Sequence, residues 1–495
     1  MPRITNNQRI IFGLKIRELR KAAGLSFSDL SKESTLSVSY LNEIEKGKKY
    51  PKADKIKILA DTFGISYDDL ITPVLSNSLL PVGELLESNF LNELPLDLFG
   101  IETSKLVELI ASAPTRVGAF ISAILNIAQK HEVQEENFYF SALRSYQELQ
   151  LNYFDDIENA VEQFSKEFSI DTFFKIKKVN LSRVLKSKYG YKIEEGLADD
   201  PELKKLRFVF DEKKKTLYIN KSLNESQKIF ILGRELGYNY LGLKQRFYTT
   251  SIFKVESFQQ VLNHFKASSF AVALMINKTR FVKDIQSFFS KPKWDEEFLL
   301  NLFTRYGASP EMVFYRLTNV LPKYFGIRNL FFLKFKNVAG KDSFALTKEL
   351  HLSKRHNPHA NEQKEHYCRR WVSLWMLHAL HAQQQSKKPN LPMIGIQKSQ
   401  YHGTKDKYLC ITVAYPQHPF EKNNYSVTIG LQVDELLYNT VDFVSDKNIS
   451  TQKVNLTCER CSVEDCKERA ADPIILHKKK DRARLKQSIK ELTEK

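Results

Sequence analysis

The sequence predicts a multidomain α+β protein, and three observations support that fold class. The first seventy residues carry apolar positions at helical spacing with closely placed helix-capping residues. Two short alternating segments lie near residue 210, and strand-like runs dominate after Gly326. The length suits about three or four domains. The expected divisions are an all-α domain over 1–72, a helical linker or dimerisation region over 73–170, an α+β middle domain over 171–325, an α+β effector domain over 326–477 and a charged tail over 478–495.

Helix signals follow one another closely at the start of the chain. The first helix has an apolar face formed by Phe12, Ile16 and Leu19. Gly24 ends this helix, and the capping-box spacing of Ser26–Asp29 begins a second, short helix. After a tight turn, Ser37 caps a third helix that runs from Val38 to about Lys46.

Two further helices complete this domain. The fourth has an apolar face at Ile56, Leu59, Ala60 and Phe63. Gly64 ends it, and Ser66 caps a short fifth helix. In this order the second helix lies across the phosphate backbone and the third enters the major groove. The layout predicts a helix-turn-helix DNA-binding domain, and the alternative is a small helical bundle that does not bind nucleic acid.

The third helix and the segment after it carry side chains suited to DNA. Hydroxyl and amide groups on the outward helix face can read base edges, and the lysines that follow can neutralise phosphates. The predicted DNA-binding residues are Ser37, Ser39, Tyr40, Asn42, Lys46, Lys48 and Lys49. One such domain reads only a half-site, so we expect a homodimer on double-stranded operator DNA, with the helical segment 103–170 as the dimer contact.

The run from Leu36 to Lys48 resembles the phage-repressor (XRE-type) family. Two positions depart from the family pattern: Phe27 stands where Gln is usual, and Ser31 stands where Ala is usual. The first departure removes a common DNA contact, so the operator sequence does not follow by analogy.

Bulk composition agrees with a DNA-binding protein. The chain has 75 Lys and Arg against 58 Asp and Glu, a formal net charge of +17, which favours a polyanionic partner. No apolar run reaches the roughly 18–20 residues of a membrane span, and no signal peptide precedes the first helix. We expect a cytoplasmic, nucleoid-associated bacterial protein that does not bind membranes. Five cysteines in such a compartment do not form a disulfide framework.

The middle of the chain combines two strands with several helices. The strands are expected over 206–210 and 216–219, and the helices over 143–168, 224–242, 257–279 and 281–324. The segment Phe230–Tyr238 resembles the ImmA/IrrE family of zinc peptidases, in which a His-Glu-x-x-His motif binds zinc. The resemblance implies a zincin-like fold.

The zinc ligands of that family are missing here. Arg234 and Tyr238 occupy the two His positions, Glu235 matches the general base, and His264 falls where the third ligand, normally Glu, would lie. Arg is always charged and does not bind zinc. We therefore expect no peptidase activity and a vacated cleft in which Arg234, Tyr238 and His264 face a small ligand. The plainer alternative is that Arg234 and Glu235 lie on an ordinary helix surface or form a structural ion pair.

A cluster of cysteines lies near the carboxy terminus. Cys458, Cys461 and Cys466 have the spacing C-x2-C-x4-C, which lets three thiolates converge on one soft metal centre. A [4Fe–4S] cluster and a structural zinc both fit, and each needs a fourth ligand. Cys368 is the preferred fourth ligand and His366 the second choice. The alternative is three free thiols on a loop, and Cys410, in an apolar strand pattern, is expected to be a buried core thiol.

The last third of the chain is expected to contain strands over 329–335, 408–415 and 425–431, a helix over 367–381 and a charged terminal helix from 478. Its cysteine segment and His366–Trp371 resemble the effector domain of the short-chain fatty acyl regulator family. The resemblance implies a transcription factor of acetate- or propionate-type acyl metabolism that senses an acyl-CoA-like ligand and carries a metal centre. Arg369 and Arg370 are candidate ligand contacts. The alternatives are an active metallopeptidase that cleaves a repressor, and an iron–sulfur redox sensor that controls transcription.

Overall fold

The structure is a computed structural model that describes residues 6–72, 135–197, 200, 202–249, 255–352, 365–386, 392–416 and 423–493. The chain forms two compact units, Met1–Tyr146 with Lys254–Val261 and Gln147–Phe253 with Leu262–Lys495. Residues 103–134, nearly half of the segment predicted to form the dimer contact (103–170), lie outside the described residues. In the described part of the chain, no helix has the length and apolarity needed to span a bilayer.

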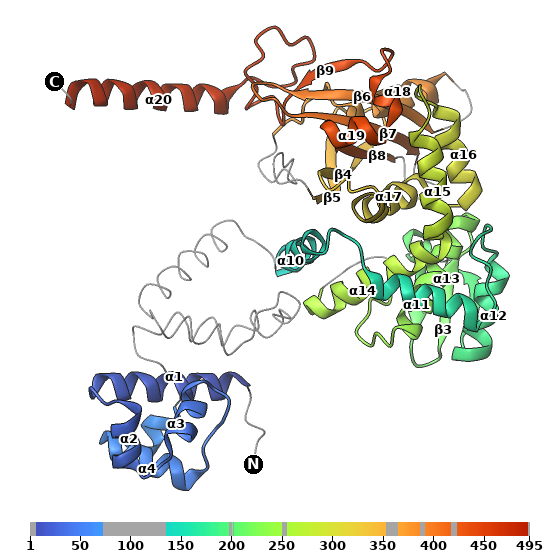
Figure 1. The fold of residues 1–495 in the computed structure, drawn as a ribbon. Coiled ribbons are helices and arrows are strands. Elements are labelled where there is room, and N and C mark those ends of the chain that lie inside the picture. The colour runs from blue at the N-terminus through green and yellow to red at the C-terminus, as the bar shows by residue number, and fades with distance from the viewer. Residues whose placement is uncertain are drawn as a thin grey trace. The chain divides into compact units, whose positions relative to one another are not determined.

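The amino-terminal domain has the five helices that the sequence predicts: α1 (Asn6–Ala22), α2 (Phe27–Ser34), α3 (Val38–Glu45), α4 (Ala53–Phe63) and α5 (Tyr67–Ile71) (Figure 1). The predicted capping box of α2 and the Ser37 cap of α3 are both formed. Gly64 ends α4 in the left-handed conformation, as predicted.

Two contacts hold α3 against α1. A Cβ at Gly13 would lie 2.3 Å from the carbonyl oxygen of Ile44, so only glycine allows the two backbones to approach this closely. Arg20, near the end of α1, donates from Nε and Nη2 to the two carboxylate oxygens of Glu45 at 2.6 and 3.0 Å. These contacts fix the orientation of the predicted recognition helix within its domain.

The second unit begins with an α+β region. Its sheet has the order β1-β3-β2, where β1 (Lys192–Gly196) is parallel and β2 (Phe208–Asp211) antiparallel to β3 (Thr216–Asn220). The helices of this region are α11 (Asp155–Glu167), α12 (Lys178–Tyr189), α13 (Glu225–Tyr240), α14 (Phe258–Met275), α15 (Lys278–Phe289), α16 (Glu296–Tyr306) and α17 (Pro310–Tyr324), with a short 3-10 turn at Leu203–Lys205. Helix α12 and strand β1 were not predicted from the sequence.

The single helix predicted over 143–168 is wrong. The chain forms α10 (Glu135–Leu149) and α11, separated by a turn in which Leu151 and Asn152 have positive φ angles of 51°. Asn152 is fully buried and donates from Nδ2 to the hydroxyl of Thr318 at 2.7 Å. The helix predicted over 257–279 likewise ends early, because Asn277 caps α15.

A six-stranded sheet with the order β5-β4-β8-β7-β6-β9 forms the carboxy-terminal region. Its strands are β4 (Leu330–Val338), β5 (Phe344–His351), β6 (Met393–Tyr401), β7 (Lys407–Pro416), β8 (Asn423–Gln432) and β9 (Thr451–Val454). The predicted strands correspond to β4, β7 and β8, while β5, β6 and β9 were missed because polar residues interrupt their apolar pattern. The remaining elements are α18 (Val372–Gln385), α19 (Glu435–Thr440), a 3-10 turn at Asp442–Ser445 and α20 (Ile474–Thr493).

Helix α18 packs on β6, β7 and β8. A Cβ at Gly395 in β6 would lie 2.7 Å from the sulfur of Met376, so this glycine allows the close approach. The sequence predicted that this helix begins at Tyr367, but it begins at Val372. Tyr367 instead forms a β-bridge with Thr457. Cys368 therefore lies in extended chain ahead of α18 and not on the helix.

A buried ion pair joins α11 to α17. Arg316 is 2% exposed and donates from both terminal nitrogens to the carboxylate of Glu158. Burial acts to lower the pKa of Arg316, but the charge and hydrogen bonds of Glu158 outweigh it and raise that pKa. The guanidinium also donates from Nε to the carbonyl of Ile276 at 3.2 Å, which ties the end of α14 to the same pair.

Glu158→Gln should lower the free energy of unfolding by about 3–5 kcal/mol, because it leaves Arg316 buried without a counter-charge. Urea denaturation measures the change. Asp155→Asn is the matched control, since Asp155 and Lys323 form an exposed pair at 3.2 Å and its loss should cost less than about 1 kcal/mol. Equal effects of the two variants would contradict the structural importance of the buried pair.

Candidate functional site

The residues predicted to read DNA lie on and next to α3. Ser39 is exposed, and Asn42 and Tyr40 are partly exposed. The hydroxyl of Ser37 accepts a hydrogen bond from the backbone N–H of Tyr40 at 3.3 Å, so Ser37 also caps the helix. The ring of Tyr40 packs against the domain core. Ser39 and Asn42 are therefore the residues whose side chains have no such structural role and remain available to base edges.

The predicted phosphate-binding lysines follow directly. Lys48 and Lys49 are exposed, and Lys46 is partly exposed. The ammonium of Lys49 lies 3.4 Å from the carboxylate of Glu43 and 5.1 Å from the centroid of the Tyr40 ring. An exposed pair of this kind is weak, so a phosphate can compete for Lys49.

The peptidase-like motif is buried on α13. Arg234 is 4% exposed, and its guanidinium stacks on the ring of Phe208 at 4.2 Å. Its Nε and Nη2 have no hydrogen-bond partner. Burial lowers the pKa of Arg234 although Glu235 is adjacent, and the positive charges of Arg246 and Arg207 add to this effect. Arg234 is therefore a buried cation with no carboxylate paired to it among the described residues, and its burial excludes the ordinary helix surface considered above.

The carboxylate of Glu235 is already paired. Glu235 is fully buried and forms an ion pair with Arg246, and the Tyr191 hydroxyl donates to it at 3.2 Å. Arg246 also stacks on the ring of Tyr238 at 4.3 Å. Arg246 and Tyr191 were not predicted as site residues, because neither belongs to a recognisable sequence motif. A structural ion pair involving Glu235 does exist, but its partner is Arg246 and not Arg234.

Tyr238 and His264 are brought together beside Arg234. The Tyr238 hydroxyl lies 3.1 Å from Nδ1 of His264. Burial lowers the pKa of His264 to about 3, and the positive charge of Arg234 contributes in the same direction. The imidazole is therefore neutral at physiological pH. The three residues predicted to face the vacated cleft form one local cluster.

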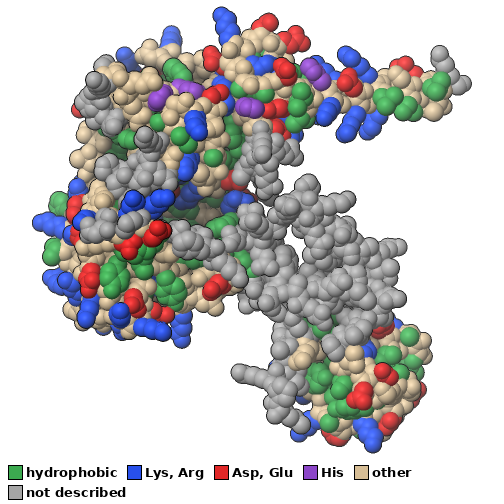
Figure 2. Space-filling model, turned by 180° about the vertical axis from the view of Figure 1, so that it is seen from behind, with side chains coloured by type: hydrophobic (Ala, Val, Ile, Leu, Met, Phe, Trp, Pro, Cys, Tyr) green, Lys and Arg blue, Asp and Glu red, His purple; other side chains and the backbone are tan. Residues whose placement is uncertain are grey.

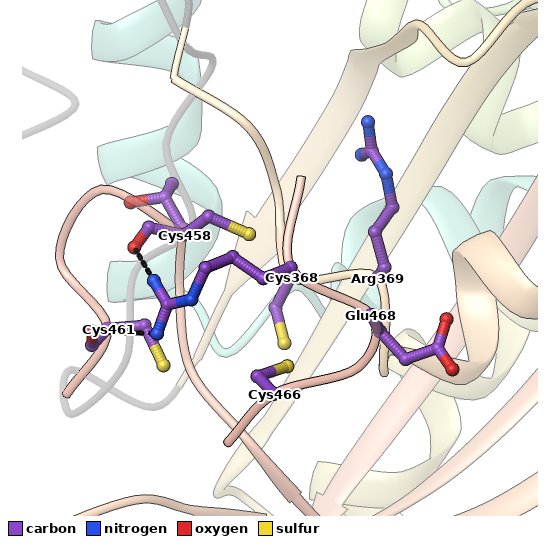
Figure 3. Close-up of a pocket in the computed structure, with 8 residues that line it drawn as sticks. Cys368, Arg369, Cys458, Cys461, Cys466 and Glu468 are labelled. Atoms are coloured by element: carbon purple, nitrogen blue, oxygen red, sulfur yellow. Dashed lines mark hydrogen bonds between the residues drawn. The ribbon is translucent and has the colours of Figure 1, made fainter. Parts of the chain in front are cut away.

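The four cysteines predicted to bind a metal line one pocket. The lining residues are Cys368, Arg369, Thr457, Cys458, Cys461, Cys466, Glu468 and Arg469 (Figure 3). Cys410 lies on β7 instead, where burial raises the pKa of its thiol to about 12, as suits a core residue. The C-x2-C-x4-C spacing predicted that three of these thiols lie together. The fourth, Cys368, comes from a segment about ninety residues earlier, and the fold places it at the same pocket.

Backbone pairing brings the two cysteine segments together. The N–H of Cys368 donates to the carbonyl of Leu456 at 3.1 Å, and the N–H of Cys458 donates to the carbonyl of His366 at 2.8 Å. Two further backbone N–H groups point at sulfur: Asn455 to Cys368 at 3.5 Å and Ala470 to Cys458 at 3.4 Å. Donors of this kind favour sulfur that carries negative charge.

Other predicted residues near this pocket are engaged elsewhere. Nδ1 of His366, the second choice for a metal ligand, lies in hydrogen-bond contact with a carboxylate oxygen of Glu459 at 2.8 Å. Arg369 pairs with Asp342 at 3.0 Å and stacks on Phe344, and Arg370 donates to the carbonyl of Lys453 at 3.3 Å. These contacts hold the pocket wall in place.

A metal centre requires the four thiols to draw closer. Within the described ranges, no three His, Cys, Asp or Glu side chains are arranged so that they could hold a metal ion. The donor set nevertheless fits a soft metal, because four sulfur atoms line one pocket and two of them accept backbone N–H groups. Arg469 supports the loop by donating to the carbonyls of Cys458 and Cys461 at 3.3 and 3.5 Å.

The helix-turn-helix geometry defines a DNA-binding class of protein, and comparisons with known proteins agree. Residues 16–70 match the family described as Helix-turn-helix, and residues 192–318 match the IrrE N-terminal-like domain of the M78 peptidases. Through its amino-terminal domain the chain belongs to the HTH-type transcriptional regulators.

Three curated relatives match this domain. An HTH-type transcriptional regulator of Deinococcus deserti, DdrOP3, is 37% identical over 60 residues, which cover 12% of the chain and 46% of the relative. The uncharacterized regulator YazB of Bacillus subtilis is 41% identical over 13% of the chain and 91% of its own length. The control protein C.BamHI of Bacillus amyloliquefaciens is 32% identical over 14% of the chain and 85% of its own length. The match thus spans less than half of the first relative and most of the other two.

A solved structure titled Mycobacterium tuberculosis transcriptional regulator aligns with 67% of this chain and 93% of its own length. Its identity is 14% and its TM-score 0.48. This similarity is too low to bear on function.

The residues on the outward face of α3 and the lysines that follow the helix should contribute differently to DNA binding: the first to sequence selectivity, the second to affinity for any duplex. Asn42→Ala should weaken binding to a duplex selected from a random pool by about 1–3 kcal/mol while random duplex is bound as before. Lys48→Gln should weaken binding to both duplexes and make the salt dependence shallower by roughly 0.9 in log–log slope. Fluorescence anisotropy at several salt concentrations measures both effects. Lys57→Gln, on the exposed side of α4, is the control. An equal loss on both duplexes for Asn42→Ala would exclude base reading.

Proposed function

We propose that this transcriptional regulator controls short-chain acyl metabolism of the acetate or propionate type, binds an acyl-CoA-like ligand and carries a cysteine-bound metal centre. The observation that carries the sensor assignment is the convergence of four thiols from two distant segments at one pocket. It acts as a homodimer on a double-stranded operator in the bacterial nucleoid, because one domain reads a half-site.

The metal centre is proposed at Cys368, Cys458, Cys461 and Cys466. A [4Fe–4S] cluster would supply a redox-sensitive anionic centre, and zinc would supply a structural cross-link between the two segments. Three of the thiols are buried and Cys466 is partly exposed, which leaves one side of the pocket open to solvent species. Arg469 binds the loop carbonyls and brings positive charge close to the thiolates, which favours an anionic centre.

The acyl ligand is proposed to bind at the former zinc cleft. A buried Arg234 without a counter-ion is costly, and an anionic group on a ligand would satisfy its free Nε and Nη2. Tyr238 and neutral His264 lie beside it and can exchange hydrogen bonds with a polar ligand. Acyl-CoA carries phosphates on a partly apolar body, which suits this combination. Arg369 and Arg370 are weaker candidates because both are already engaged.

We propose that the peptidase-like domain does not hydrolyse peptides. A zinc peptidase needs two His ligands and a Glu that can take a proton from metal-bound water. Here Arg234 stands at the first ligand position, and Glu235 is held by Arg246. The surviving carboxylate is thus a structural partner. Ligand binding would instead alter the spacing of two DNA-binding domains, a coupling of typically about 1–3 kcal/mol.

Each Cys→Ser change at positions 368, 458, 461 and 466 should abolish stoichiometric metal in anaerobically purified full-length protein, because each removes one of four ligands. Cys410→Ser is the matched control and should retain the metal. Metal analysis and the visible absorbance spectrum are the readouts: a broad band that bleaches on reduction identifies iron–sulfur, and colourless protein with zinc identifies the structural site. Metal content unchanged in Cys368→Ser would exclude it as the fourth ligand.

A redox sensor is the second candidate function, since a [4Fe–4S] centre is itself an input. Oxidised and reduced protein should then differ in DNA affinity. Equal affinity before and after loss of the cluster would remove this candidate and leave the acyl ligand as the input.

Arg234→Gln should weaken binding of propionyl-CoA by about tenfold or more, because a hydrogen bond between charged groups is worth about 1.5–3 kcal/mol. The same change should leave the ligand-free protein as stable or more stable, since it removes an unpaired buried charge. Isothermal titration calorimetry and urea denaturation measure the two effects. Arg305→Gln, at an exposed ion pair with Asp284, is the control. Wild-type affinity in Arg234→Gln would place the ligand elsewhere.

A further inference from the structure

Helix α20 (Ile474–Thr493) has no buried residue. It extends away from the six-stranded sheet of its own unit (Figure 1). Leu485, Ile489 and Leu492 are 63%, 52% and 78% exposed. An isolated helix of this length is marginally stable in water, so contact with another molecule would stabilise it.

The helix is strongly basic. Residues 474–493 contain seven Lys and Arg and two Asp and Glu, a formal charge of +5, while the whole of residues 1–72 has +4. Figure 2 shows Lys and Arg side chains along the helix. The most basic element in this comparison is therefore outside the helix-turn-helix domain.

Four of these basic residues share one face. Lys479, Arg482, Lys486 and Lys490 are separated by three, four and four positions, and all four are exposed. At a rise of about 1.5 Å per residue they extend over roughly 16 Å. This is the scale on which successive phosphates follow one strand of a duplex, at about 3.4 Å each along its axis.

The apolar positions are too few for a stable contact between two copies of the helix. Leu485, Ile489 and Leu492 make one short stripe, and toward the start of the helix that stripe continues at Lys478 and Arg482. A coiled coil needs apolar residues over about three or four heptads. Charge complementarity therefore favours a polyanion over a second copy.

The first turn of α20 is held by the cysteine loop. The N–H groups of Ile475 and Leu476 both donate to the carbonyl of Glu459 at 3.1 Å. Glu459 lies between Cys458 and Cys461, so the base of the helix is fixed to the loop that lines the cysteine pocket.

We propose that α20 is a second DNA-binding surface, which contacts the phosphates of duplex DNA without reading sequence. This inference rests on DNA binding by the amino-terminal domain and is independent of the identity of the metal or the acyl ligand. The helix raises the affinity for any duplex, and α3 selects the sequence. Because both surfaces belong to one chain, binding of one raises the effective concentration of the other at the DNA.

The test compares full-length protein with a variant carrying K479Q, R482Q, K486Q and K490Q. Glutamine keeps the helix propensity and removes the charge. On a random-sequence duplex the affinity at low salt should fall by about tenfold or more. The log–log salt slope should become shallower by roughly 0.9 for each phosphate that the variant no longer neutralises. The matched control removes four exposed lysines from the body of the second unit, as K213Q, K244Q, K405Q and K447Q, and should change affinity much less.

Asn42→Ala separates this proposal from operator recognition, since it should lower selectivity and leave the salt slope unchanged. If the α20 variant keeps the wild-type affinity and slope, α20 does not bind DNA. If the four-lysine control loses as much affinity as the α20 variant, the effect comes from net charge alone and not from α20. A changed oligomeric state in L485Q, I489Q and L492Q with unchanged DNA affinity would identify a second copy as the partner. If the α20 substitutions weaken binding to anionic vesicles but leave binding to the duplex unchanged, the partner of α20 is a lipid surface.

Discussion

The carboxy-terminal region depends on one short antiparallel contact, in which residues 366–368 pair with residues 456–458 through backbone hydrogen bonds. On one side of the contact the chain enters α18, which packs on the sheet. On the other side β9 leads into it, and β9 is fixed by parallel pairing with β6. The pairing therefore sets the position of Cys368 relative to Cys458. The carbonyl of Glu459, just beyond the contact, then fixes the start of α20.

Two clusters of buried charge in the second unit differ in how their charges are balanced. Arg316 and Glu158 satisfy each other, so their pair joins α11 and α17 and needs no ligand. On α13 the charges do not balance: Glu235 pairs with Arg246, and in the part of the chain that the structure describes no carboxylate pairs with Arg234. The buried cluster that stands at the zinc-ligand positions of the peptidase family is thus electropositive through arginine. This unbalanced charge is the basis on which an anionic ligand is proposed there.

The sequence predicted the elements whose signals are local. The caps at Ser26, Ser37 and Gly64 and the apolar strands β4, β7 and β8 follow from residues close together in the chain. It did not predict β5 and β9, which are strands only because neighbouring strands pair with them, nor the break at Asn152, whose side chain is satisfied by the distant Thr318. Arg246 was missed for the same reason, because its role as the partner of Glu235 exists only in the folded protein. Cys368, in the segment His366–Trp371, was predicted as the fourth metal ligand. Only the fold shows that it lines the same pocket as the other three thiols.

The location of the cysteine pocket has a consequence for control of DNA binding. A centre that links residues 368 and 458–466 would stiffen the contact from which α20 emerges, because the loop between Cys458 and Cys461 carries the hydrogen bonds to its first turn. Loss of the centre would loosen that turn without disturbing the sheet, whose strands are paired independently. A basic helix that is rigidly directed meets duplex DNA at a smaller entropic cost than one that is free to swing. The state of the four thiols would then change affinity for any duplex through α20, while the ligand proposed at Arg234 would act separately through the spacing of the recognition helices in the proposed dimer.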